Sequence, residues 1–141
     1  MNRSSMLIAL GAAAVASAVA TTVRAAERLP ENLIGQYASR SEHLSKVIPV
    51  ELSNIKVTGQ KVTGVVSRYT NGNGTCAANS TPFTGTYKDG VLSIKSRTIT
   101  SRRNGVNCGR LVLNAKVSGG RVVGTFGLGA DNGTPIELAA K

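Results

Sequence analysis

The feature that most constrains the fold of this chain is an alternation of apolar and polar residues with a period of two, which dominates from about residue 50 onward. The segment from Cys108 to Val117 is the clearest case, because Leu111, Leu113 and Ala115 recur at every second position. Residues spaced in this way point to the same face of a β-strand. Turn dipeptides interrupt the pattern at intervals of about 8–12 residues, a spacing typical of an all-β sandwich or barrel of short strands.

Turn chemistry divides the alternating region into separate strands. Asp89-Gly90 is a strong hairpin signal, because a type I′ turn requires positive φ at both of its central residues. At Ser53-Asn54 the alternation slips by one residue, which predicts a β-bulge. The expected strands are Leu33 to Ser39, Val50 to Val57, Val62 to Tyr69, Phe83 to Lys88, Val91 to Ile99, Cys108 to Val117, Val122 to Leu128 and Ile136 to Ala139.

Two recurring patterns indicate hairpins that follow one another along the chain. The segment 56–64 matches 116–124 at five of nine positions, as two similar hairpins would. Gly-x-aromatic occurs at Gly35, Gly85 and Gly124, and glycine inside a strand marks a sharp bend or a close backbone approach. We therefore expect a small antiparallel meander of seven or eight strands that forms a barrel or a sandwich. Ser41 to Ile48 is the only helical candidate, of at most one or two turns.

The first 26 residues have the organisation of a secretory signal peptide. Arg3 supplies a basic start, and an uncharged, Ala-rich run from Met6 to Ala20 follows it. Thr21, Thr22 and Arg24 end this run before the roughly 20 apolar residues that a membrane span needs. We expect removal of residues 1–26, a single domain over 27–141 with no membrane span, and a periplasmic or secreted location.

Cys76 and Cys108 are the only cysteines, and in an exported chain two cysteines predict one disulfide. The bond would close a loop of 33 residues and contribute about 3.7 kcal/mol in the chain-entropy treatment. Two cysteines and the single histidine, His43, cannot complete a four-ligand zinc site, so we expect no metal.

Positive charge is concentrated in the middle of the chain, whose formal net charge is +10. Between Leu52 and Ala130 there are eleven Lys or Arg residues and one acid, Asp89. A disulfide between Cys76 and Cys108 would gather several of these charges at one end of the domain. We expect an anion-binding patch, the basic cluster, formed by Lys95, Arg97, Arg102, Arg103 and Arg110.

Several other functions lack the residues that they need. Five aromatic residues and no Trp are few for stacking nucleic-acid bases, and no nucleic-acid-binding motif is present, which disfavours nucleic acid as a partner. No nucleophile motif or phosphate-binding glycine loop occurs, so we expect no catalytic residue and no cofactor. The apolar content of 41% excludes a disordered polybasic chain.

The stretch that contains Leu29-Pro30, Leu33 and Gly35-Gln36-Tyr37 resembles, over about nine residues, the start of the bacterial periplasmic inhibitors of secreted metalloproteases. Members of that family are small eight-stranded barrels with one disulfide, and their N-terminal arm enters the protease active site. The resemblance implies that Ala26 to Leu29 would be the inserting arm. The chain departs from the family pattern in having Tyr37 where the family favours Trp, and in cysteines that come later in the sequence.

These observations favour an exported, non-enzymatic protein that binds an acidic partner, either an envelope polyanion or an acidic protein, through its basic cluster. One alternative is a protease inhibitor that acts through its N-terminal arm. Another is a carrier of a small apolar ligand in a barrel lumen. A fourth interpretation is that the charges only solvate the surface and protect exposed strand edges.

Overall fold

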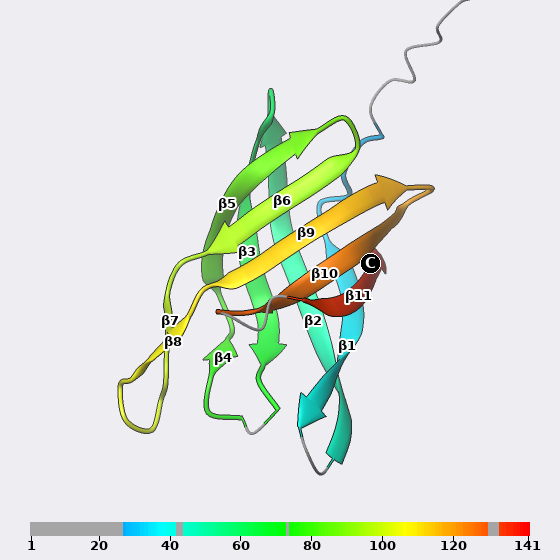
Figure 1. Ribbon diagram of the computed structural model, residues 1–141. Coiled ribbons are helices and arrows are strands. Elements are labelled where there is room, and N and C mark those ends of the chain that lie inside the picture. The colour runs from blue at the N-terminus through cyan, green and yellow to red at the C-terminus, as the bar shows by residue number, and fades with distance from the viewer. Residues whose placement is uncertain (1–26, 42–43, 73, 130–132) are drawn as a thin grey trace, which may run out of the picture.

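Eight long antiparallel strands close into a barrel in the computed structural model, which describes residues 27–41, 44–72, 74–129 and 133–141 (Figure 1). The predicted signal peptide, residues 1–26, lies outside the described residues. The strands are β1 (Leu33–Ser41), β2 (Leu44–Thr58), β3 (Lys61–Thr70), β4 (Ala77–Ala78), β5 (Thr81–Lys88), β6 (Val91–Ser96), β7 (Ile99–Thr100), β8 (Asn107–Gly109), β9 (Leu111–Ser118), β10 (Arg121–Leu128) and β11 (Thr134–Ala140).

The barrel is a meander with two short insertions. Its ring order is β1, β2, β3, β5, β6, β9, β10 and β11, and β11 pairs with β1 to close it. The short strand β4 pairs with the end of β3, and β7 and β8 form a hairpin between β6 and β9. Both insertions lie at the lower end of the barrel in Figure 1, which we call the disulfide end. The predicted all-β meander with about eight strands is confirmed.

Local turn chemistry accounts for the hairpins. Asp89 and Gly90 have φ of 52° and 76°, so the predicted type I′ conformation is present at both positions. The bulge predicted in β2 is also present: its register with β3 shifts between Ser53 and Lys56, and Asn54 has a φ of 53°.

Two predicted strands are interrupted at the disulfide end. The strand expected over Val91 to Ile99 ends at Ser96, and Ile99 belongs to the separate hairpin strand β7. The strand expected from Cys108 is divided between β8 and β9. β8 ends at Gly109, which has a φ of 95°, and Arg110 lies between the two strands. The apolar alternation stops at both breaks, because Ile99 is out of phase with Leu92 and Ile94 and Gly109 precedes Leu111 at the inward position, so both strands were predicted too long.

The helix considered for Ser41 to Ile48 is wrong for the residues that the structure describes. Ser41 ends β1, and Leu44 to Ile48 begin β2. The backbone of this part of β2 pairs with β1, with Val47 opposite Ala38 and Ile48 opposite Tyr37. β-Branched residues favour such pairing, and a residue that precedes a proline, as Ile48 does, avoids helical geometry.

The core fills the interior of the barrel. Leu111, Leu113, Ala115 and Val117 of β9 are all buried, as the alternation predicted, and Lys116 is exposed. The largest completely buried side chains come from seven of the eight barrel strands: Phe126, Leu33, Leu52, Leu92, Leu113, Leu138, Val50, Val62, Val66 and Val122.

The three glycines of the Gly-x-aromatic pattern mark positions where neighbouring backbones approach closely. A Cβ atom on Gly85 would overlap the carbonyl oxygen of Ser93 and lie 2.7 Å from Ile94 Cα. Gly35 and Gly124 meet the backbone of the adjacent strand in the same way. The Gly-x-aromatic pattern therefore records tight strand contacts in the barrel wall.

We predict that Gly85→Ala destabilises the protein by about 1–3 kcal/mol, because the added methyl group overpacks the contact with β6. Gly133→Ala is the control, since nothing lies within 4 Å of a Cβ atom there, and its effect should stay within about 0.5 kcal/mol. Urea denaturation followed by circular dichroism measures both. Equal effects of the two substitutions would contradict the close approach.

Candidate anion-binding site

The basic cluster is distributed over β6, the β7–β8 hairpin and the start of β9. Lys95 lies on β6, and Arg97 follows the last residue of that strand. Arg102 and Arg103 lie in the turn between β7 and β8, and Arg110 directly precedes β9. All five side chains are exposed. They come from one continuous stretch of chain that joins two neighbouring barrel strands.

The buried hydroxyl of Ser96 bonds to the backbone where the chain leaves β6 at Arg97 and enters β9 after Arg110. Ser96 is 3% exposed; its Oγ accepts a hydrogen bond from the Leu111 amide (2.9 Å) and donates to the Arg97 carbonyl oxygen (2.8 Å). The Arg97 amide also donates to the carbonyl oxygen of Pro82 (3.0 Å). Sequence analysis missed Ser96, although a polar residue at an inward position after Leu92 and Ile94 was a signal for it.

The β7–β8 hairpin has a defined turn. The Gly105 amide donates to the Ser101 carbonyl oxygen (3.0 Å), and the Ser101 amide donates to the Val106 carbonyl oxygen (2.8 Å). The Arg103 amide donates to Ser101 Oγ (3.3 Å). These bonds order the loop through its backbone groups and the Ser101 hydroxyl. The side chains of Arg102 and Arg103 therefore extend from a structured loop.

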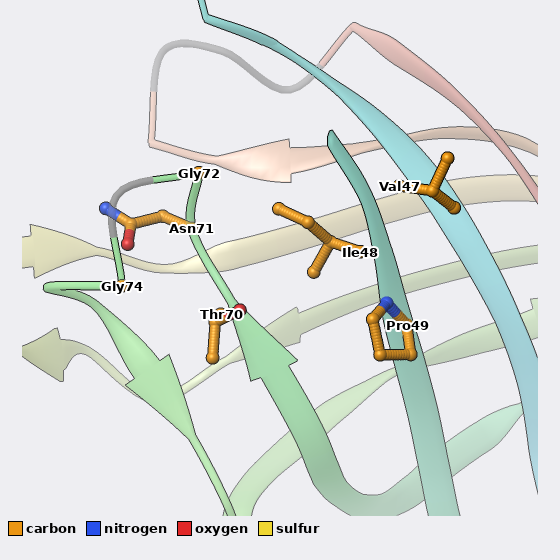
Figure 2. A pocket seen from close by; sticks show the side chains of 7 residues that line it. All are labelled: Val47, Ile48, Pro49, Thr70, Asn71, Gly72 and Gly74. Atoms are coloured by element: carbon orange, nitrogen blue, oxygen red, sulfur yellow. The ribbon is translucent and has the colours of Figure 1, made fainter. Parts of the chain in front are cut away.

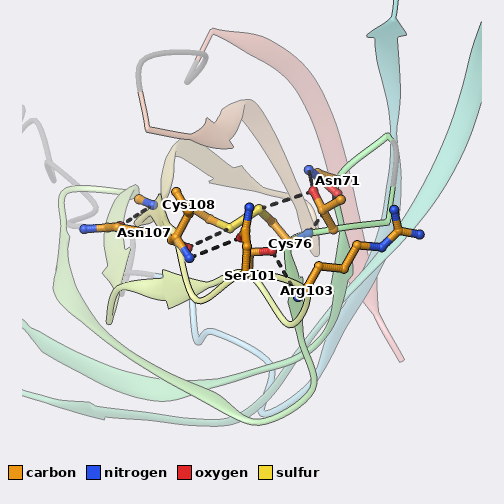
Figure 3. The surroundings of a disulfide bond; sticks show 10 residues. Asn71, Cys76, Ser101, Arg103, Asn107 and Cys108 are labelled. Carbon is orange, nitrogen blue, oxygen red and sulfur yellow. Dashed lines mark hydrogen bonds between the residues drawn. A yellow bond between two sulfur atoms is a disulfide. The ribbon is translucent and has the colours of Figure 1, made fainter.

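The disulfide between Cys76 and Cys108 joins this hairpin to the polar loop after β3 (Figure 3). The predicted pairing is confirmed. On the Cys76 side of the disulfide, the side-chain Oδ1 of Asn71 accepts a hydrogen bond from the backbone amide of Cys76 (3.1 Å). The backbone amide of Asn71 donates to the Cys76 carbonyl oxygen (2.9 Å). The disulfide is compatible with an oxidising, exported location.

Negative charge is absent from the part of the chain that bears the basic cluster. No Asp or Glu occurs between Val91 and Gly129. In the described part of the molecule the salt bridges are Arg121 with Glu137 (3.1 Å) and Lys141 with Glu51 (2.7 Å), and neither uses a residue of the cluster. The cluster therefore presents its charge outward.

An open pocket lies beside the disulfide end, between β2 and the loop that follows β3 (Figure 2). Its volume is about 410 Å³, and none of its lining residues is titratable. The lining offers hydroxyl, amide and aliphatic groups. It consists of Val47, Ile48, Pro49, Thr70, Asn71, Gly72 and Gly74.

Three aromatic rings pack together inside the barrel. The ring centroids of Tyr37, Tyr69 and Phe126 lie 5.5–5.9 Å apart, and the Tyr37 hydroxyl donates to the Thr70 carbonyl oxygen (2.8 Å). Burial raises the pKa of Tyr69 well above its ordinary value, and the neighbouring Tyr37 raises it further. Burial also raises the pKa of Tyr37, which the hydrogen bond with Tyr69 partly offsets. Both tyrosines therefore remain neutral in the folded protein at physiological pH.

The described residues of the arm that the protease-inhibitor resemblance implies pack on the opposite end of the barrel. Leu29 belongs to the hydrophobic core and is 7% exposed. The Tyr87 hydroxyl donates to the Glu27 carbonyl oxygen, and Glu27 Oε1 accepts a bond from the Gly119 amide (2.8 Å). Burial, and to a smaller extent the charge of Glu27, raises the pKa of Tyr87. Ala26 lies outside the described residues.

Across 27–41, 44–72, 74–129 and 133–141, His, Cys, Asp and Glu form no group of three or more that could hold a metal ion. His43 lies outside the described residues. The described chain contains no helix with the length and apolar character that crossing a bilayer requires.

Comparison of the chain with known family models, curated proteins and solved structures finds no match.

We predict that replacing both cysteines, Cys76→Ser with Cys108→Ser, lowers the free energy of unfolding by about 3.7 kcal/mol, because the unfolded chain regains the entropy of a long loop. Hydrogen exchange should accelerate more in the β7–β8 hairpin than in β9. The wild-type protein under a reducing agent is the control and should behave alike. A change below about 1 kcal/mol would contradict a stabilising role for the bond.

We predict that the stability of the barrel falls as pH rises above about 10, the ordinary pKa of tyrosine. The unfolded chain loses its tyrosine protons there, but Tyr69 keeps its proton in the fold, so the stabilisation present below pH 10 is lost as pH increases. Tyr69→Phe should make this decline shallower in urea denaturation at alkaline pH. Ionisation of Tyr69 near pH 10 in the folded protein, seen as tyrosinate absorbance, would contradict the prediction.

Proposed function

We propose that this protein is an exported, non-enzymatic binding protein whose basic cluster binds an anionic partner outside the cytosol. The observation that carries the proposal is the exposure of all five cationic side chains on a stretch of chain without acidic residues. Such a surface attracts polyanions and raises their rate of association. The disulfide and the sequence of residues 1–26 support a periplasmic or secreted location.

The aromatic residues support recognition by charge and hydrogen bonding. All five of them, Tyr37, Tyr69, Phe83, Tyr87 and Phe126, are at most 8% exposed. None is available to stack on a base or on a sugar ring, which is how single-stranded nucleic acids are usually held. A partner of the basic cluster is thus recognised through its negative charges.

The two alternatives receive less support from the geometry. A lumen carrier needs an empty interior, but Leu92, Ile94, Leu111, Leu113 and Phe126 are each 5% exposed or less and fill that space. An inhibitor arm needs a projecting N-terminus, whereas Leu29 is packed into the core. We therefore base the proposal on the basic cluster.

We predict that Arg102→Ala with Arg103→Ala weakens binding to long-chain inorganic polyphosphate about 2- to 30-fold, the loss of two exposed charge contacts. The affinity of the wild-type protein should fall steeply with salt concentration. Fluorescence anisotropy of labelled polyphosphate at several salt concentrations measures both effects.

The matched control is Lys56→Ala with Arg68→Ala, which removes the same charge from exposed positions on β2 and β3. Salt-independent binding, or equal losses in the two double variants, would contradict a specific role for the basic cluster.

A further inference from the structure

Strand register places further cations on the outer surface of the barrel, in line with the basic cluster. β6 and β9 are neighbours, and their outward-facing residues form paired positions along the seam between them: Val91 with Lys116, Ser93 with Asn114, and Lys95 with Val112. On the other side of β6, Lys88 of β5 is paired with the same residue, Val91. Lys88 and Lys116 thus flank Val91 on the outside of three adjacent strands.

The charged positions recur along this seam. Four residues of strand separate the Lys116 position from the Lys95 position, which corresponds to about 13 Å. Arg97 and Arg110 follow as the chain leaves β6 and enters β9, about two residues or 7 Å further on. Cations therefore extend over roughly 20 Å, and the hairpin arginines lie beyond them.

Neutral hydrogen-bonding groups occupy the position between the lysines. Ser93 Oγ donates to Asn114 Oδ1 (2.8 Å), which occupies the amide oxygen and leaves the Asn114 amide nitrogen to donate to a ligand. Asn114 is exposed, and Thr86 and Thr125 lie beside this pair on β5 and β10. The middle of the seam can thus bond to phosphate, sulfate or sugar oxygens without opposing their charge.

We infer that the β6–β9 seam, from Lys88 and Lys116 to Arg97 and Arg110, binds an extended linear polyanion that continues onto Arg102 and Arg103, the hairpin residues of the basic cluster. This inference rests on the proposed function and assigns its partner to one class, a flexible polymer with a repeating phosphate, sulfate or carboxylate group. The positive charges of the seam lie along a line, and a polymer with regularly repeated negative charges can contact all of them at once.

A folded acidic protein fits this surface less well. Protein interfaces depend on buried aromatic and other large anchors at their centre. The seam offers Val91 and Val123, which are 45% and 50% exposed and separated by Lys116, and no aromatic side chain. The observations therefore favour a polymer over a protein surface.

The first test compares ligand lengths within one chemistry. Inorganic tripolyphosphate is too short to reach from Lys116 to Arg110, whereas long-chain polyphosphate can span the whole seam. Lys88→Ala with Lys116→Ala should weaken binding of the long chain about 2- to 30-fold and lower the slope of log affinity against log salt by about 2. The same variant should bind tripolyphosphate at most twofold more weakly than the wild type.

The second test adds a negative charge at the neutral centre of the seam without changing its shape. Asn114→Asp keeps an acceptor for the Ser93 hydroxyl but introduces a carboxylate, so it should weaken long-chain binding at least as much as the double lysine variant. Gln36→Glu on β1, across the barrel from the seam, adds the same charge and is the control. Thermal unfolding checks that both variants fold. Dextran sulfate in place of polyphosphate distinguishes sulfated glycans from phosphate polymers.

The outcomes separate this inference from the proposed function. Suppose that Arg102→Ala with Arg103→Ala weakens binding, but Lys88→Ala with Lys116→Ala matches Lys56→Ala with Arg68→Ala, and Asn114→Asp matches Gln36→Glu. The basic cluster then binds without the seam, and the proposed seam site is wrong. If long-chain polyphosphate and dextran sulfate bind no more tightly than tripolyphosphate, the partner is compact, such as an acidic protein. The assignment of the partner to linear polymers is then wrong. If no anion binds, the proposed function itself fails.

Discussion

The pairing of the first barrel strand with the last is the contact on which the rest of the structure depends. β1 and β11 pair over five residues, from Leu33 opposite Ala140 to Tyr37 opposite Ile136. This pairing closes the ring and leaves no free edge between these two strands, which in an open sheet would each expose a row of unpaired amide and carbonyl groups. It also brings together segments that are about a hundred residues apart in sequence, so the pairing carries the entropy cost of closing a long loop.

Closure sets where binding can occur. In a ring of eight strands, alternate side chains from every strand meet in one narrow interior, and here large aliphatic and aromatic residues fill it. The glycines at 35, 85 and 124 let neighbouring backbones approach closely enough for that packing. All five aromatic side chains are used inside, so the outer surface offers hydroxyl, amide, charged and scattered aliphatic side chains but no aromatic ring. Under the proposed function, recognition therefore uses charge and hydrogen bonds on the outside of the wall.

The insertions at the disulfide end add to this surface without disturbing the ring. The β7–β8 hairpin leaves the barrel after β6 and returns at β9, and the bond between Cys76 and Cys108 holds it to the loop after β3. Where the hairpin leaves the barrel, the Ser96 hydroxyl hydrogen-bonds to the Arg97 carbonyl oxygen and to the Leu111 amide. A rigid wall that positions exposed loops is a common basis for binding sites, because the loops vary while the wall fixes their place.

Sequence by itself determined the strands, most of their turns and the disulfide, since alternation and positive-φ turn residues act over a few positions and two cysteines have one possible pairing. It was wrong about a helix near Ile48, where pairing with β1 overrides the local pattern. It gave the residues of the basic cluster, which are nearly consecutive, but not Lys88 and Lys116, which join the same line only through the register of β5, β6 and β9. Only the tertiary structure decided that the sheet closes and that Leu29 packs into its core, because both depend on contacts between distant segments whose energies no local pattern contains.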